Sequence, residues 1–166
     1  ILAYPMDRFF NYGQKYAYNI NWVDPTLEVL EKLDGTLIIV YFDIITSNWC
    51  VATRSVPDAD IINENNFTYR NLFEKSLKET RNISFDELTS KLHKNVTYCF
   101  ELTSPYNRIV VYYKDTKCNL LAARDNKSLL EIDINNILCD IPHVKKHDFK
   151  DLNSIVSYVN NLNPLN

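Results

Sequence analysis

Residues 27–43 read Leu-Glu-Val-Leu-Glu-Lys-Leu-Asp-Gly-Thr-Leu-Ile-Ile-Val-Tyr-Phe-Asp. Two runs rich in Leu, Ile, Val, Tyr and Phe, 27–32 and 36–43, flank the pair Asp34-Gly35. An Asp-Gly pair between two such runs is a strong signal for a tight hairpin turn. We therefore expect two neighbouring strands joined at Asp34-Gly35.

The apolar periodicity changes along the rest of the chain. Residues 66–80 have apolar side chains at helical spacing, and Ser84 with Glu87 has the spacing of a capping box that starts a second helix. A third helix is expected over 148–162. Strand character returns at 48–54, 96–103, 108–114 and 118–124, whereas 128–139 is ambiguous. This order predicts one α+β domain over residues 1–166, with mainly antiparallel sheets and flanking helices.

Glycine is scarce, because only Gly13 and Gly35 occur in 166 residues. Average usage of about 7% would give roughly a dozen. A P-loop needs two glycines in one short loop, a dinucleotide-binding fingerprint needs three, and the nucleophile elbow of hydrolases needs two beside a serine. A protein of this composition that handles a nucleotide must therefore do so by another route.

The remaining composition is that of an ordinary globular domain with a sizeable core, at 46% hydrophobic and 23% charged residues. A net charge of −3 argues against a surface that binds nucleic acid everywhere, but it permits a local basic groove. The four cysteines are far apart and form no CxxC pair, so we expect reduced thiols and no zinc site. No apolar run reaches the length of a membrane span.

Lys32 stands next to the Asp34-Gly35 pair and fits two interpretations. In the first, Lys32 is a solvated lysine at the end of a strand, beside an ordinary turn. In the second it is a nucleophile, which must lose its proton in a site with little water or with nearby positive charge. Asp34 alone would favour the protonated amine, so other cations or a metal would have to oppose it.

The segment Lys32-Leu33-Asp34-Gly35 resembles the Lys-x-Asp-Gly signature of covalent nucleotidyltransferases, which include ATP-dependent DNA and RNA ligases and capping enzymes. Three further segments are similar, in order and spacing, to blocks of the RNA ligase 1 family of T-even bacteriophages. They are Pro5-Met6-Asp7-Arg8-Phe9-Phe10-Asn11, Ala52-Thr53-Arg54-Ser55 and Phe100-Glu101-Leu102-Thr103-Ser104-Pro105-Tyr106-Asn107-Arg108-Ile109-Val110. The similarity spans residues 1–113.

The resemblance implies a nucleotidyltransferase fold and an ATP-dependent RNA ligase. Lys32 would attack the α-phosphorus of ATP, form a lysyl-AMP phosphoramidate and release pyrophosphate. AMP would then pass to an RNA 5′-phosphate, and the 3′-hydroxyl of another RNA end would displace it. The implied setting is RNA repair, with broken tRNA as one candidate substrate.

The resemblance also implies a role for each matching residue. Lys32, Asp34 and Gly35 form the catalytic signature, in which Asp34 orients the nucleophile loop or the ribose. Glu101 contacts the ribose and helps to hold Mg²⁺, as suits a hard oxygen ligand. The remaining residues of the nucleotide site are Arg8, which would contact the triphosphate, and Arg54, which would lie near the phosphates or the RNA end.

Each assignment has a structural alternative. Arg8 could instead be a solvated charge with its stem over Phe9 or Phe10. Arg54 fits as an ordinary charge at a strand end, and Asn107 with Arg108 would then close a turn. Glu101 favours function more strongly, because a carboxylate within the apolar run 99–102 needs a partner or a ligand.

Two alternatives for the whole chain stay open: a DNA ligase or capping-type nucleotidyltransferase, and a nucleotide- or RNA-binding module without catalysis. The family also has acidic Glu-Gly and Lys-x-Lys motifs, and residues 140–166 show no convincing match to them. We therefore expect a partial adenylyltransferase domain, 1–166, that ligates poorly or not at all by itself. We further expect a monomer in the cytoplasm, that of the host cell if the chain is phage-encoded, with no membrane partner.

Overall fold

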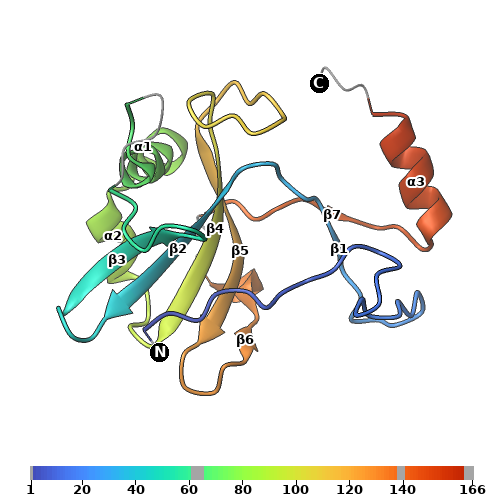
Figure 1. Cartoon of the computed structure of the whole chain (residues 1–166), viewed down its shortest axis with the longest axis horizontal. Coiled ribbons are helices and arrows are strands. Elements are labelled where there is room, and N and C mark those ends of the chain that lie inside the picture. Colours follow the sequence, from blue (N-terminus) through green and yellow to red (C-terminus); the bar gives the residue numbers. More distant parts are fainter. Residues whose placement is uncertain (1, 61–65, 138–140, 163–166) are drawn as a thin grey trace. The chain divides into compact units, whose positions relative to one another are not determined.

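The structure is a computed structural model, and it describes residues 2–60, 66–137 and 141–162. The chain forms two compact units, which can be followed by the sequence colours in Figure 1. The first unit contains Ile1–Asp7 and Leu33–Val144, and the second contains Arg8–Lys32 and Lys145–Asn166. The chain therefore crosses between the units after Asp7, after Lys32 and after Val144.

The first unit is built on a five-stranded antiparallel sheet with the order β3-β2-β4-β5-β6 (Figure 1). Its strands are β2 (Thr36–Asp43), β3 (Asn48–Thr53), β4 (Val96–Thr103), β5 (Lys117–Asp125) and β6 (Glu131–Ile132). Ile38 of β2 is paired with Thr53 on one side and with Phe100 on the other. The expected α+β class with antiparallel strands is confirmed, as are the strands expected at 36–43, 48–54, 96–103 and 118–124.

Two helices, α1 (Tyr69–Arg81) and α2 (Phe85–Ser90), pack on one face of this sheet. The N-terminus of α2 carries the predicted capping box. Glu87 N–H donates to Ser84 Oγ at 3.2 Å, and Ser84 N–H donates to Glu87 Oε2 at 2.7 Å. These hydrogen bonds satisfy two amides that an uncapped helix would leave without partners.

The core lies between the helices and the sheet. Phe73 of α1 is fully buried, and its ring centroid is 5.2 Å from that of Phe100 on β4. Cys118 is buried in the same core, and burial raises the pKa of its thiol to about 11. Cys50, Cys99 and Cys118 are free thiols, as expected, and Cys139 lies outside the described residues.

The N-terminal segment runs along the other face of the sheet. On β4, Thr97, Cys99 and Glu101 alternate with core residues and therefore point away from the helices. Tyr4 N–H donates to Thr97 Oγ1 at 3.0 Å, which fixes the segment against β4. Burial on this face raises the pKa of Cys99 to about 12.

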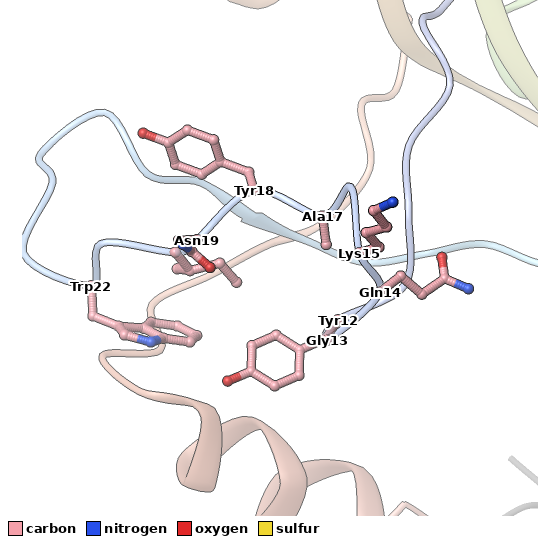
Figure 2. A pocket seen from close by; sticks show the side chains of 9 residues that line it. Tyr12, Gly13, Gln14, Lys15, Ala17, Tyr18, Asn19 and Trp22 are labelled. Atoms are coloured by element: carbon pink, nitrogen blue, oxygen red, sulfur yellow. The ribbon is translucent and has the colours of Figure 1, made fainter.

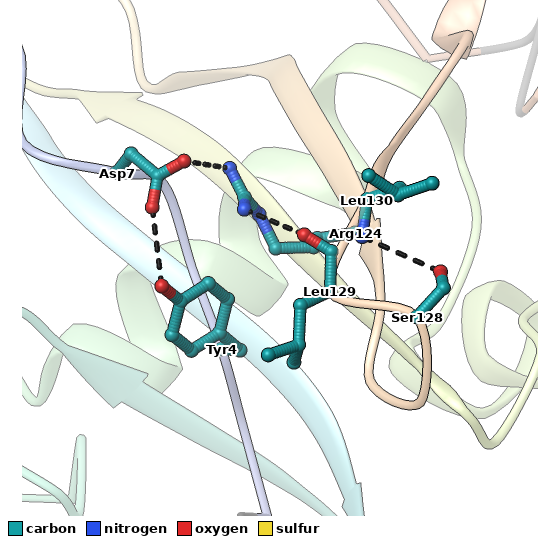
Figure 3. Close-up of polar contacts among 6 residues, drawn as sticks. All are labelled: Tyr4, Asp7, Arg124, Ser128, Leu129 and Leu130. Atoms are coloured by element: carbon teal, nitrogen blue, oxygen red, sulfur yellow. Dashed lines mark hydrogen bonds and ion pairs between the residues drawn. The ribbon is translucent and has the colours of Figure 1, made fainter.

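Arg124 on β5 holds the end of that segment (Figure 3). Its side chain is 10% exposed and forms an ion pair with Asp7, with Nη2 and Oδ2 2.9 Å apart. Nη1 donates to the Leu129 carbonyl at 2.8 Å, and Leu129 has a left-handed φ of 61°. Tyr4 also contributes, because its hydroxyl donates to Asp7 and its ring lies under the guanidinium.

The second unit is smaller and contains fewer regular elements. β1 (Val29–Leu30) pairs antiparallel with β7 (Lys146–His147), and α3 (Leu152–Asn160) follows with Asp151 as its N-cap. The rings of His147 and Phe149 are stacked with centroids 5.3 Å apart. Across the described parts of both units, every helix is too short or too polar to cross a membrane.

The hairpin expected at Asp34-Gly35 is wrong. The apolar run 27–32 supplies β1, whose partner is β7, whereas 36–43 forms β2 between β3 and β4. The chain has no assigned turn between Lys32 and Asp34. The Asp34-Gly35 pair directly precedes β2, so it marks the start of a strand of the sheet. The same two residues in a two-residue hairpin turn would look identical in the sequence.

Two other expectations need correction. The segment 108–114 is no strand, because the amides of Val110 and Val111 donate to a side chain and are not available to a neighbouring strand. The third helix begins at Leu152 instead of 148 and ends at Asn160; the stop expected at Asn163-Pro164 lies outside the described residues. The ambiguous segment 128–139 contains β6 and a 3₁₀ turn.

The capping box gives a test of the fold. We expect Ser84→Ala to lower the free energy of unfolding by about 1 kcal/mol, because the Glu87 amide loses its acceptor. Ser90→Ala, at the other end of α2, is the matched control and should change stability by less than about 0.5 kcal/mol. Urea denaturation of both variants makes the measurement, and equal losses would contradict the assignment.

Candidate functional site

Gly35 lies where β2 begins, in close contact with β4. Its amide donates to Glu101 Oε1 at 2.9 Å. A Cβ atom at this position would lie 2.3 Å from the Leu102 carbonyl oxygen and 3.1 Å from Thr103 Cγ2. Only glycine fits this approach, since the oxygen belongs to the backbone of a central strand and cannot move aside.

Glu101 is half-buried on the face of β4 that points away from the helices. Its backbone pairs with Leu37 on one side and with Asn119 on the other. The carboxylate reaches back to the Gly35 amide, so two residues predicted for the site are in direct contact. Hydrogen bonds to an ionised carboxylate are stronger than those between neutral groups, and this one ties the signature segment to β4.

Asp34 organises the loop that follows β4. Its Oδ2 accepts hydrogen bonds from Val110 N–H and Val111 N–H, each at 2.7 Å. Its own amide donates to the Tyr113 hydroxyl at 3.1 Å. Two segments more than 70 residues apart therefore meet at one carboxylate, and these are two of the segments that carry the family resemblance.

Asn107 connects the loop after β4 to the start of β2. Its Nδ2 donates to Thr36 Oγ1 at 2.5 Å, one residue beyond Gly35, and its amide donates to the Ser104 carbonyl. Arg108 is exposed, and its Nε donates to the Val110 carbonyl within the loop. These contacts agree with the structural alternative for both residues.

The three basic residues are exposed. Arg54 directly follows Thr53, the last residue of β3. Thr53 pairs with Ile38 of β2, and the neighbouring Leu37 pairs with Glu101 of β4, so Arg54 and Glu101 lie at the same end of the sheet. Lys32 and Arg8 belong to the second unit. The guanidinium of Arg8 lies 5.1 Å from the centre of the Phe10 ring, as its structural alternative describes.

The structure thus brings together Asp34, Gly35 and Glu101, and the catalytic roles assigned to the site residues stay predictions. Sequence reasoning missed Tyr113 and Arg124. Tyr113 lies in an apolar run that gave no sign of a hydrogen bond with Asp34. Arg124 did give a signal, because a charge at the end of Leu120-Leu121-Ala122-Ala123 needs a partner when that strand is buried.

A divalent metal was expected at Glu101. Within 2–60, 66–137 and 141–162 no group of three His, Cys, Asp or Glu side chains is placed to hold a metal. A single half-buried carboxylate still suits Mg²⁺, which is commonly bound by one or two carboxylates together with substrate phosphates and water. The side chains present would therefore fit a metal that is bound together with the phosphates of a nucleotide.

A lysine two residues before an Asp-Gly pair, with the glycine amide bound to a strand carboxylate, marks the chain as a candidate covalent nucleotidyltransferase. The family model for RNA ligase matches residues 1–160. The chain belongs to this family, the RNA ligase 1 family indicated by its sequence motifs.

Two viral relatives are similar to the chain. An RNA ligase of Rhodothermus phage RM378 is 26% identical over 152 residues, covering 75% of this chain and 33% of the relative. A protein of Autographa californica nuclear polyhedrosis virus, described as a bifunctional polynucleotide kinase/RNA ligase, is 31% identical over 141 residues, covering 77% of this chain and 20% of the relative. The chain thus spans a third or less of the length of these proteins.

Two solved structures are also similar. One is an archaeal ATP-dependent RNA ligase, with a TM-score of 0.49 and 15% identity, over 72% of this chain and 30% of the other. The second is a lysine-to-alanine mutant of Naegleria gruberi RNA ligase with ATP and Mn, with a TM-score of 0.48 and 15% identity, over 73% and 36%.

The two glycines provide a matched pair of variants. Gly35→Ala should destabilise the first unit by about 1–3 kcal/mol, because the new Cβ overlaps the Leu102 carbonyl. Gly13→Ala has open space, and its cost of about 1–2 kcal/mol comes only from a φ of +79° in the second unit. Hydrogen exchange should show lost protection in β2 and β4 for Gly35→Ala alone; the same loss in Gly13→Ala would contradict this.

Asp34 can be tested at the loop that it holds. Asp34→Ala removes the acceptor of two amides, each worth about 0.5–1.5 kcal/mol, so exchange at Val110 and Val111 should become much faster. Asp34→Asn keeps an oxygen at the same place and should retain most of the protection. Unchanged exchange in Asp34→Ala would show that the loop is held by other contacts.

Proposed function

We propose that residues 1–166 are part of the adenylyltransferase domain of an ATP-dependent RNA ligase. The observation that carries the proposal is the contact of the Asp34-Gly35 segment with Glu101 and with the 110–111 loop, in a chain that belongs to the RNA ligase family. These contacts fix the backbone that directly follows Lys32. A nucleophile needs such fixed surroundings in order to meet its target in the correct geometry.

In the proposed reaction, the neutral amine of Lys32 attacks the α-phosphorus of ATP. A P–N bond forms, the bond between the α-phosphorus and its bridging oxygen breaks, pyrophosphate leaves, and the amine proton passes to solvent. An oxygen of the 5′-phosphate of an RNA end then attacks the phosphorus of AMP, the P–N bond breaks, and Lys32 takes up a proton to regain its amine. The 3′-hydroxyl of a second end attacks that phosphate and displaces AMP, so the RNA is sealed.

We assign the supporting roles by residue. Glu101 would accept a hydrogen bond from the ribose and hold Mg²⁺, which would offset the charge of the phosphates. Arg8 and Arg54 would contact phosphate groups, for which the planar guanidinium is well suited. Asp34 would keep the nucleophile loop in place. Broken tRNA in the cytoplasm of an infected cell is the substrate and setting that we favour, with the protein acting as a monomer.

The direct test uses the protein expressed from its complete reading frame. Incubation with ATP labelled at the α-phosphate and MgCl₂ should attach label to the protein through an acid-labile bond to Lys32. Lys32→Ala should remove the label, because a methyl side chain has no nucleophile. Lys127→Ala, which changes an exposed lysine of the turn before β6, is the matched control and should keep it. Absence of label in the wild type, or label in Lys32→Ala, would contradict the proposal.

Glu101→Gln separates charge from structure. The amide oxygen of glutamine can still accept the Gly35 N–H, so the fold should be retained. The loss of the negative charge should slow adenylylation by roughly 10²-fold, since electrostatic groups at reacting phosphates commonly contribute that much. Rates are measured over a series of Mg²⁺ concentrations, with hydrogen exchange in β2 as the structural control. An unchanged rate would remove Glu101 from the proposed metal site.

A further inference from the structure

The second unit contains a hollow of about 380 Å³, which is formed by the turns between Tyr12 and Trp22 (Figure 2). Gly13, with its left-handed backbone, and the hydrogen bond from Gln14 N–H to the Asn11 carbonyl shape the first of these turns. The side chains that line the hollow with aromatic, amide or charged groups are Tyr12, Gln14, Lys15, Tyr18, Asn19 and Trp22.

The aromatic side chains of the hollow are available to a ligand. Tyr12 is 67% exposed and Tyr18 83% exposed, whereas Trp22 is half-buried. Figure 2 shows the rings of Tyr12 and Trp22 below the backbone at Tyr18 and Asn19, and the ring of Tyr18 above it. Such exposure of large aromatic rings contributes little to the stability of a domain and is typical of binding surfaces.

The charge at this hollow favours a polyanion. Lys15 carries the one charged side chain among its nine lining residues, and its ammonium lies over the neighbouring Tyr16 ring, 5.1 Å from the ring centre. A second hollow in the same unit is different, because its lining includes Asp24 and Asp148 together with Lys146 and Lys150. Aromatic faces with a neighbouring cation and without carboxylates are what proteins use to stack the bases of single-stranded nucleic acid, whose phosphates an acidic residue would repel.

We propose that this hollow binds a nucleobase of the single-stranded RNA end, stacked on Tyr12 and Trp22, with Lys15 attracting a neighbouring phosphate. The inference rests on the proposed function, since it takes RNA as the substrate. It adds a base-contacting site outside the nucleotide-binding residues. Stacking of this kind tolerates any base, so the site gives affinity for an unpaired end and little sequence preference.

The test compares a 5′-phosphorylated single-stranded RNA with the same oligonucleotide lacking bases near its end. Binding to the protein expressed from its complete reading frame is followed by fluorescence anisotropy. The wild type should bind the abasic RNA roughly tenfold more weakly. Tyr12→Ala should bind the intact RNA as weakly as the wild type binds the abasic one, and it should no longer distinguish the two.

Tyr16→Ala is the matched control. Tyr16 is 69% exposed, nearly as much as Tyr12, but its ring packs against Phe10 and does not line the hollow. It touches the proposed site through the Lys15 ammonium, which lies 5.1 Å from its ring centre and is assigned to the phosphate, not to the base. This variant should keep the preference for intact RNA. Lys15→Gln should keep that preference as well, while the dependence of log affinity on log salt concentration becomes shallower by about 0.7.

The inference would be overturned if Tyr12→Ala kept the preference for intact RNA, or if Tyr16→Ala lost it to the same extent. It would also be overturned if light scattering showed that the wild type is a dimer which Tyr12→Ala separates, because the hollow would then be an interface between copies of the chain. Adenylylation of Lys32 distinguishes this inference from the proposed function. If Tyr12→Ala is still labelled with AMP and binds RNA like the wild type, only the base site is contradicted. If the wild type is not labelled, the proposed ligase function is contradicted.

Discussion

The close approach of Gly35 to β4 is the constraint on which the arrangement of the site depends. The Leu102 carbonyl occupies the space that any side chain at this position would need, and the Glu101 carboxylate binds the glycine amide beside it. Lys32 is three residues away along the chain, and three residues span at most about 11 Å. The backbone that enters β2 after Lys32 is therefore fixed by a steric contact between two backbones and by one charge-assisted hydrogen bond.

Asp34 extends this constraint to the loop after β4. By accepting two backbone amides, its carboxylate gives the loop a defined shape without regular secondary structure. The loop leaves Val110 and Tyr112 largely exposed, so packing alone would not hold it. The Lys-x-Asp-Gly signature thus acts as a structural element as well as a candidate reaction centre, and its aspartate has a role that needs no bound nucleotide.

Much of the first unit could be predicted from the sequence because its signals are local. The capping box at Ser84 and the apolar runs of β2 and β4 each act over a few residues, and the structure contains them nearly as expected. The hairpin at Asp34-Gly35 failed because its outcome depends on a partner strand distant in sequence. The partners of Asp34 and Arg124 were out of reach for the same reason. The sequence indicates that Arg124 needs a partner, but nothing near it identifies Asp7, and nothing near Asp34 identifies Val110.

The backbone at Leu129 shows how the chain manages with few glycines. Left-handed φ angles near 60° occur at four non-glycine positions in the described chain, Ser47, Asn66, Asn82 and Leu129. Serine and asparagine are suited to turns, but leucine at such a φ costs about 1–2 kcal/mol relative to glycine. Arg124 holds the strained carbonyl and the ion pair with Asp7 through the same guanidinium. A glycine at position 129 would therefore remove this strain and raise the free energy of unfolding of the first unit. That gain could offset a destabilising substitution elsewhere in the same unit.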